Sequence, residues 1–300
     1  MLRREFLAGG VSVAAMVGDA GAASAQVRPN EKRQNDQGPY KLGVAAYSYR
    51  KYLQGAGKSM SLVDFIRECA EMGSDGVELT EYYFEKPVTA EQVLKLKRTA
   101  HLWGQSVTGT PIGNTFTHPA GEARNRELQR VRDWIDVSAD LGSPAIRIFA
   151  GNKPKEFSEG QARKHVIETL EQLLPHAEKR GVFLALENHG GVVAEADGLL
   201  EIVRAVTSPW LGINLDSGNF QTTDPYGDLA RCAPYAVTVQ YKVEMLPKGR
   251  PKEEADLPRI LKILRGAGYR GFVTLEYESA EEPRVAVPRI VASMRKALSA

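Results

Sequence analysis

The feature that most constrains this chain is a regular alternation of short apolar runs and longer amphipathic stretches, which begins at Lys41. Eight runs have the length and the apolar, β-branched character of strands, and a helical stretch follows each of them. Many of these stretches end in glycine, a common residue after the last turn of a helix. The predicted strands lie at residues 41–49, 76–84, 105–113, 145–151, 182–190, 211–220, 236–244 and 271–278.

Eight strand–helix units in roughly 260 residues match the size and order of a (β/α)₈ barrel. The other α/β arrangement with this alternation is a doubly wound open sheet. That fold commonly carries a glycine-rich phosphate loop after a strand, such as G-x-G-x-x-G, and no such loop occurs here. No linker-like segment interrupts residues 41–300. We therefore predict a single α/β domain, a TIM barrel, over residues 41–300.

The first forty residues have a different character. Arg3 and Arg4 precede a short apolar stretch of small residues, which closes with Ala-Ser-Ala at residues 23–25. This pattern is typical of a twin-arginine export signal, and its apolar part is too short to span a bilayer. We predict a signal peptide over residues 1–25, a flexible polar leader over residues 26–40, and a periplasmic mature protein with no membrane attachment. The alternative is a basic N-terminus on a disordered tail.

Composition excludes some classes of partner and of scaffold. The chain has 39 Lys and Arg against 37 Asp and Glu, so its net charge gives no reason to expect nucleic-acid binding. Two cysteines, Cys69 and Cys232, are too few for a disulfide scaffold. Because they lie in the first and sixth predicted helices of a barrel, we expect two free thiols.

Polar residues recur at the C-terminal ends of the predicted strands. In the strand at 236–244, valines alternate with polar residues, so the valines are expected to face the helices and the polar residues the barrel axis. The same alternation applies to the other strands. The polar residues expected to point inward are Glu78, Thr80, Arg147, Glu187, His189, Asn214, Asp216, Thr238, Gln240, Lys242, Glu244, Glu276 and Glu278.

Four of these carboxylates should converge at one end of the barrel. Unpaired, they would repel one another and raise one another's pKa values. A divalent cation would neutralise them and accept their oxygens as ligands, whereas the structural alternative is a set of ion pairs with Arg147 and Lys242. For Glu78 a structural or substrate-contacting role is as open as a catalytic one. The four carboxylates are Glu78, Glu187, Asp216 and Glu276.

The strand ends carry a recognisable series of motifs. These are "GVEL" on strand two, "LENHG" on strand five, "NLDSGN" on strand six, the x-K-x-E of "VQYKVE" on strand seven, and "LEYE" on strand eight. In this order they resemble the xylose isomerase-like sugar isomerase/epimerase superfamily, which also includes endonuclease IV-type DNA repair enzymes. The resemblance covers essentially the whole chain after the signal peptide.

The resemblance implies a divalent metal held by residues of strands five to eight, which are here Glu187, Asp216, Gln240 and Glu276. Gln240 stands where the family commonly has His, and Asn219 stands where many relatives have a second His. An oxygen-only ligand set favours Mn²⁺ first, with Mg²⁺ or Co²⁺ as alternatives. Weak or absent metal binding is the other expectation that these departures leave open.

Family chemistry removes a proton next to a sugar carbonyl. The resemblance makes Glu187 and Glu276 the proton-transfer pair, working from opposite faces of the sugar, with His189 as the second choice of acid or base. Return of the proton would make the protein an isomerase or epimerase, and its export indicates an unphosphorylated small-molecule carbohydrate as substrate. The residues expected to contact substrate are Glu78, Arg147, Asn188, Asn219 and Lys242.

Two other functions stay open at this point, and a third, DNA repair, is disfavoured. Loss of a group from the carbon next to the enediolate would make a lyase that cleaves 3-keto-glycosides, which a partner sugar dehydrogenase would supply. A barrel that lost its metal would be a non-catalytic sugar-binding protein. DNA repair needs a site rich in histidine, and this chain has only five. Family relatives are often dimers or tetramers, so a homo-oligomer is a further expectation.

Overall fold

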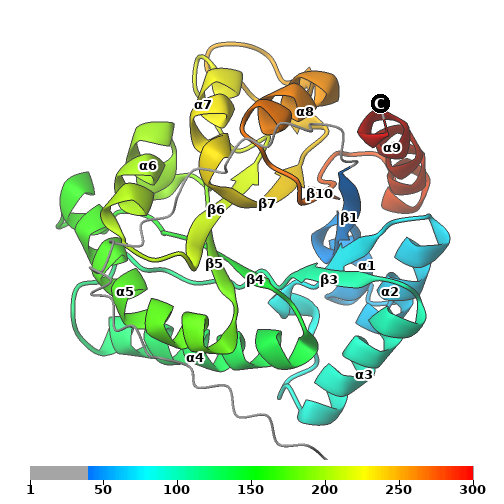
Figure 1. Cartoon of the computed structure of the whole chain (residues 1–300), viewed down its shortest axis with the longest axis horizontal. Helices are drawn as coiled ribbons and strands as arrows, with labels where there is room; N and C mark the ends of the chain where they lie inside the picture. The colour runs from blue at the N-terminus through cyan, green and yellow to red at the C-terminus, as the bar shows by residue number, and fades with distance from the viewer. Residues whose placement is uncertain (1–39, 300) are drawn as a thin grey trace, which may run out of the picture.

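The computed structural model describes residues 40–299, which form a ring of parallel strands enclosed by helices (Figure 1). The single-domain TIM barrel predicted from the sequence is confirmed. The predicted signal peptide and most of the predicted leader lie outside the described residues. Tyr40, the last residue of the predicted leader, is buried, and its ring stacks on Tyr269 with a centroid distance of 6.4 Å.

All eight predicted strands are present, each shorter than predicted at its C-terminal end. The barrel strands run in the order β3-β2-β1-β10-β7-β6-β5-β4, and the paired neighbours are parallel. Side chains of such strands are buried on both faces, which explains the continuous apolar runs. The strands are β1 Lys41–Ala45, β2 Gly76–Glu78, β3 Ser106–Gly109, β4 Ala145–Ile148, β5 Phe183–Glu187, β6 Leu211–Asp216, β7 Ala236–Tyr241 and β10 Phe272–Leu275.

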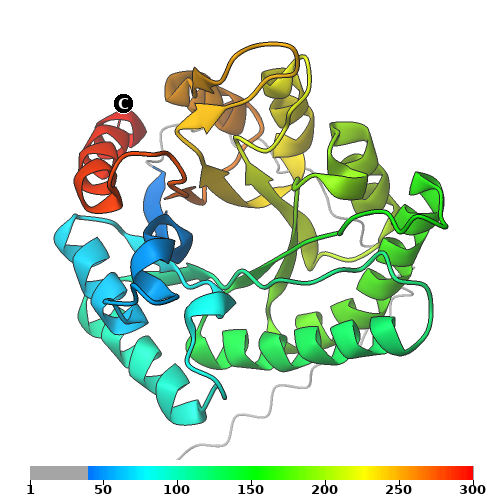
Figure 2. The same ribbon diagram turned by 180° about the vertical axis from the view of Figure 1, so that it is seen from behind.

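Helices form the outer layer on all sides of the barrel (Figures 1 and 2). Several have local start and stop signals. Ser61 and Ser158 begin α2 and α5 with capping boxes, and Gly142 and Gly181 end α4 and α5 in the left-handed conformation. The helices are α1 Arg50–Leu53, α2 Leu62–Glu71, α3 Ala90–Leu102, α4 Glu122–Leu141, α5 Glu159–Arg180, α6 Ala196–Ala205, α7 Pro225–Cys232, α8 Leu257–Gly266 and α9 Pro283–Leu298.

The ring closes at a seam between β3 and β4, where backbone bonds continue beyond the end of β3. The Thr110 amide donates to the Ala145 carbonyl at 3.1 Å, and the Ile112 amide donates to the Arg147 carbonyl at 3.1 Å. The Arg147 guanidinium also reaches across and donates to the Ile112 carbonyl at 3.0 Å. An inward side chain of β4 therefore helps to close the barrel.

Two short elements after β7 are absent from the sequence prediction. β8 (Glu244–Met245) and β9 (Glu253–Glu254) form a small antiparallel ribbon. β7 ends at Tyr241, so the alternation of faces no longer applies at Glu244, whose carboxylate pairs with Lys252 at 2.7 Å. The prediction that Glu244 points into the barrel was wrong for this reason.

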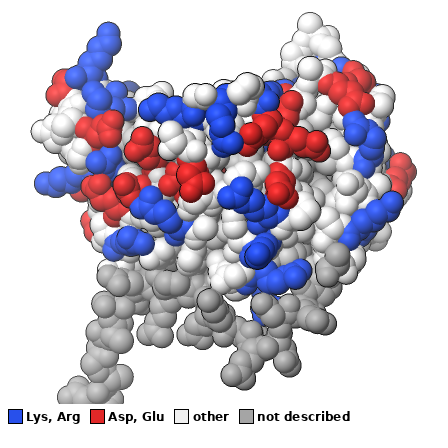
Figure 3. Space-filling view, turned by 90° about the horizontal axis from the view of Figure 1, so that it is seen from above, with Lys and Arg blue, Asp and Glu red and all other residues white. Residues whose placement is uncertain are grey.

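The state of the cysteines and the mixture of charges on the surface are those expected from the composition. Cys69 in α2 and Cys232 in α7 are buried free thiols, as predicted. Lys and Arg are interspersed with Asp and Glu over the face drawn in Figure 3. Among the helices of residues 40–299, none has the length and apolar character needed to cross a membrane.

Candidate functional site

Gln240 lies at the floor of the site, between two buried carboxylates. Its amide nitrogen donates to Glu78 Oε1 at 2.8 Å and lies 3.4 Å from Glu276 Oε1. The amide oxygen points the other way and accepts from Asn214 Nδ2 at 2.6 Å. Asn214 is fixed in turn, because its oxygen accepts from the Thr238 hydroxyl at 2.7 Å. This chain of bonds turns the N–H groups of Gln240 toward the carboxylates.

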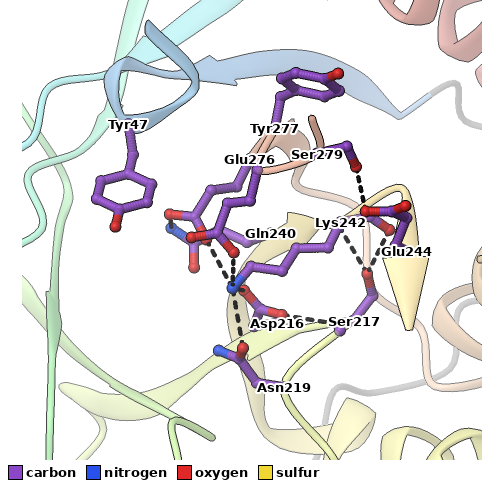
Figure 4. A network of polar contacts seen from close by, with 12 residues as sticks. Tyr47, Asp216, Ser217, Asn219, Gln240, Lys242, Glu244, Glu276, Tyr277 and Ser279 are labelled. Carbon is purple, nitrogen blue, oxygen red and sulfur yellow. Dashed lines mark hydrogen bonds and ion pairs between the residues drawn. The ribbon is translucent and has the colours of Figure 1, made fainter. Parts of the chain in front are cut away.

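The ammonium group of Lys242 is the hub of the site (Figure 4). It lies 3.3 Å from Asp216 Oδ2, 3.3 Å from Glu276 Oε2 and 2.8 Å from Glu278 Oε2. It also donates to Asn219 Oδ1 at 2.9 Å. Carboxylates from β6 and from the segment after β10 are thus held around one protein cation.

Glu187, at the end of β5, is held through both of its oxygens. Arg147 Nε lies 2.9 Å from Oε2, and Asn219 Nδ2 donates to Oε1 at 2.7 Å. Arg147 is itself buried and stacks over the Phe149 ring, with its guanidinium carbon 3.9 Å from the ring centroid. Asn219 links the two halves of the site, because its amide contacts both Glu187 and Lys242.

Asn188, for which a substrate contact was predicted, bonds the neighbouring strand with both ends of its amide. The side chain is fully buried. Its nitrogen donates to the Asp216 carbonyl at 2.9 Å, and its oxygen accepts from the Asp216 amide at 2.9 Å. Both polar groups of Asn188 are therefore used on the neighbouring strand, where they hold Asp216 in position.

His189 lies at the rim of the site beside a cavity of about 530 Å³. Its imidazole packs against the Phe149 ring with a centroid distance of 4.5 Å. Partial burial, followed by the nearby charges of Lys242 and Arg147, lowers the pKa of His189. The cavity falls within the size range of small-molecule sites, and Asn219 also lines it.

Asn114 borders the same cavity and is not among the residues predicted from the sequence. It lies beyond the end of β3, where strand alternation makes no prediction. Its amide donates to the Phe149 carbonyl at 2.7 Å and accepts from the Phe149 amide at 2.9 Å. Asn114 and Asn188 thus have the same role at two strand ends: each side chain bonds both the amide and the carbonyl of one residue on a neighbouring segment. The sequence signal for this role is an Asn that follows a strand.

Burial dominates the titration of the central carboxylates. It raises the pKa of Glu78 to about 8, with Glu276 adding to the rise, and that of Asp216 to about 6 against the effect of Lys242. Burial likewise raises the pKa values of Glu187 and Glu276 although Arg147 and Lys242 oppose it. Groups that titrate near neutral pH can accept and return protons efficiently.

Lys242 stays charged in this setting. Burial lowers its pKa, but Asp216 and Glu276 outweigh burial and raise the pKa well above its ordinary value. The hub is therefore a positive charge next to carboxyl groups whose pKa values are raised.

The donor set does not fit the four-ligand metal site that the family resemblance implies. Within residues 40–299, no three or more His, Cys, Asp and Glu side chains are grouped to hold a metal ion. The Gln240 oxygen, expected as a ligand, is occupied by Asn214. The Oδ2 atom of Asp216 is buried without a hydrogen-bond donor, and the ammonium of Lys242 lies next to it at 3.3 Å. A divalent cation would have to displace that ammonium.

Known proteins share this fold. A human candidate hydroxypyruvate isomerase is 26% identical over 242 residues, which cover 69% of this chain and 81% of that protein. The structure of 3-keto-D-glucoside 4-epimerase from E. coli superposes with a TM-score of 0.69 at 18% identity, covering 86% of this chain and 99% of that one. The IolI protein, solved with a zinc atom, superposes with a TM-score of 0.69 at 17% identity, covering 86% and 98%.

The family assignment rests on a match over most of the chain. A sequence model described as xylose isomerase-like TIM barrel matches residues 66–297, from within α2 to the last turn of α9. The matched region includes every residue of the site described above. The chain belongs to the xylose isomerase-like TIM barrel family.

Proposed function

We propose that the protein is an isomerase or epimerase of unphosphorylated sugars that moves a proton next to a carbonyl group. The observation that carries the proposal is the pair Glu187 and Glu276, two buried carboxylates with raised pKa values at the C-terminal end of the barrel. TIM-barrel enzymes place their chemistry at that end. The family also includes relatives named for isomerase or epimerase activity.

The proposed reaction assigns a task to each part of the site. One carboxylate takes a proton from the carbon next to the carbonyl, and the other returns a proton to form the product. Lys242 and Arg147 supply positive charge where the carbonyl oxygen becomes negative. His189, neutral at the rim, is the candidate for exchanging protons with sugar hydroxyls.

The charges of the site support a neutral substrate. Both of its central cations already face carboxylates: Arg147 faces Glu187, and Lys242 faces Asp216, Glu276 and Glu278. A phosphate group would compete with these carboxylates for the same two cations. Free sugars also suit the periplasmic location that we propose from the twin-arginine motif, since sugar phosphates are cytoplasmic.

A second reaction begins from the same intermediate. If the carbon next to the enediolate carries a leaving group, its loss yields an elimination product, as in cleavage of a 3-keto-glycoside. The cavity of about 530 Å³ beside His189 favours this candidate, because it offers room for a second group beyond the sugar ring. A partner dehydrogenase would have to supply the ketone.

Mass spectrometry in D₂O tests both reactions. The full-length protein is incubated with a panel of free ketoses and 3-keto-glucosides, and Glu276→Gln is compared with the surface control Glu253→Gln. We expect deuterium in an intact sugar with wild type and the control, and a loss of about 10²-fold or more with Glu276→Gln. Release of the aglycone would identify the lyase. Binding of sugar with neither product would favour a non-catalytic barrel and contradict the proposal.

A further inference from the structure

We infer that the Lys242 ammonium takes the place of a divalent metal: it neutralises the carboxylates at the strand ends and stabilises the oxyanion of the proposed reaction. The role in charge neutralisation stands on the geometry alone. The role in catalysis rests on the proposed isomerase or epimerase function.

The first support is the direction of the polar groups. A metal needs oxygen or nitrogen lone pairs pointing at one centre. Here Gln240 presents N–H groups to Glu78 and Glu276, and Asn219 presents an N–H group to Glu187. The predicted ligands Glu187 and Glu276 therefore already receive donors from neighbouring side chains.

The second support is the position of the ammonium. Lys242 Nζ lies 3.3 Å from Asp216 and 3.3 Å from Glu276, two of the four predicted metal ligands. Figure 4 shows its long side chain reaching from the end of β7 into the space between them. Asp216 Oδ2 has no hydrogen-bond donor, so this cation is what balances its charge.

The third support is that Gln240 cannot easily turn to become a ligand. A rotation of its amide would aim the oxygen at Glu78 and Glu276, two carboxylates, and its nitrogen at Asn214 Nδ2, another donor. The Thr238 hydroxyl donates to the oxygen of Asn214, which leaves the Asn214 nitrogen facing Gln240. In this arrangement each of these donors meets an acceptor, and the N–H groups of Gln240 face the carboxyl groups.

The chemistry balances without a further reactant. The C–H bond breaks, its proton goes to a carboxylate oxygen, and its electron pair moves through the carbonyl to form an oxyanion. The ammonium of Lys242 is the nearby donor that can stabilise that charge. A proton then returns to carbon, and no oxidant or reductant is consumed.

Metal content and metal-dependent stability test the inference without a substrate. Wild type, Lys242→Met, Lys242→Arg and the control Lys252→Met are purified without chelator, analysed by elemental mass spectrometry, and melted with 1 mM Mn²⁺ or EDTA. Lys252 is the matched control because it pairs with the surface carboxylate Glu244. We expect little metal in wild type and an Mn²⁺ shift of its Tm below about 1 °C, with the same result for the arginine and control variants.

Lys242→Met should behave differently, because it leaves the carboxylates without their cation. We expect Mn²⁺ to raise its Tm by about 5 °C or more. Its turnover should fall about 10²-fold, whereas EDTA should leave wild-type turnover unchanged. One equivalent of metal in wild type, or an Mn²⁺ shift in wild type as large as in Lys242→Met, would overturn the inference.

The wild-type result decides the inference even if Lys242→Met does not fold. If wild type turns over no sugar, the proposed function fails and the catalytic role of Lys242 falls with it. The metal measurements then still support or reject the role of Lys242 in neutralising the carboxylates.

Discussion

The two ends of the barrel interior are built from different residues. At the N-terminal ends of the strands, Thr108, Thr238 and Thr274 line a cavity of about 950 Å³. At the C-terminal ends, charged and amide side chains converge, and the cavity beside them measures about 530 Å³. The larger cavity thus lies away from the hub of charged groups. We therefore place the proposed site by its converging buried charges and not by cavity size.

The largest expected difference between the two ends is in reaction rate. Glu187→Gln, at the C-terminal end, should lower turnover by about 10²- to 10⁴-fold, because it removes a proton-transfer group. Thr274→Val, at the N-terminal end, should keep turnover within about twofold of wild type. Steady-state rates on the substrate found in the D₂O assay provide the measurement, and circular dichroism checks folding. Equal losses in both variants would remove the functional distinction between the ends.

A second difference concerns pH and the free energy of unfolding. Glu78 lies between the two ends, and its pKa is raised to about 8 by burial and by Glu276. The folded form therefore keeps a proton that the unfolded chain loses above pH 4.5, so the contribution of Glu78 to stability falls as the pH rises to about 8. The loss is on the order of 4 kcal/mol.

Glu78→Gln should remove that part of the pH dependence. We expect wild type to lose more stability than the variant in urea titrations between pH 5 and pH 8. Glu91→Gln, an exposed change on α3, is the control and should behave like wild type. Parallel pH profiles for wild type and Glu78→Gln would show that Glu78 ionises normally in the folded protein.

The smallest expected effect is a difference in the free energy of unfolding between substitutions at two glycines, one beside the site and one away from it. Gly191 and Gly73 both have positive φ, at 55° and 81°. A Cβ at Gly191 would lie 2.3 Å from the Gly151 carbonyl oxygen, whereas one at Gly73 would meet nothing within 4 Å. Gly73→Ala should therefore lose about 1 kcal/mol and Gly191→Ala about 2 to 3 kcal/mol in urea unfolding. Similar losses would indicate that the loop after β5 relaxes freely.

The sequence predicts the framework of this protein well because that framework follows from periodicity. Alternation of faces turned Glu78, Glu187, Asp216 and Glu276 inward, and all four are buried in the structure. It also placed Lys242 inward, one residue beyond the end of β7. The same rule failed at Glu244, because alternation holds only while the backbone stays in the strand.

Hydrogen-bond direction is the part that the sequence cannot give. Whether Gln240 offers its oxygen or its nitrogen to the carboxylates depends on its hydrogen-bond partner Asn214 on β6, which is bonded in turn to Thr238 on β7. Likewise, nothing in "LENHG" distinguishes an Asn that contacts substrate from one that bonds the neighbouring strand, as Asn188 does. These choices are made by tertiary neighbours.

The seam between β3 and β4 has a consequence for the ring as a whole. Arg147 donates to the Ile112 carbonyl across the seam, and its Nε faces Glu187. The side chain is thus shared between the joint of the barrel and the charge of the site. If Glu187 is removed and Arg147 moves, we expect the hydrogen bond from Arg147 to the Ile112 carbonyl to weaken as well. The mechanical integrity of the barrel wall and the electrostatic state of its interior are therefore coupled through one guanidinium group.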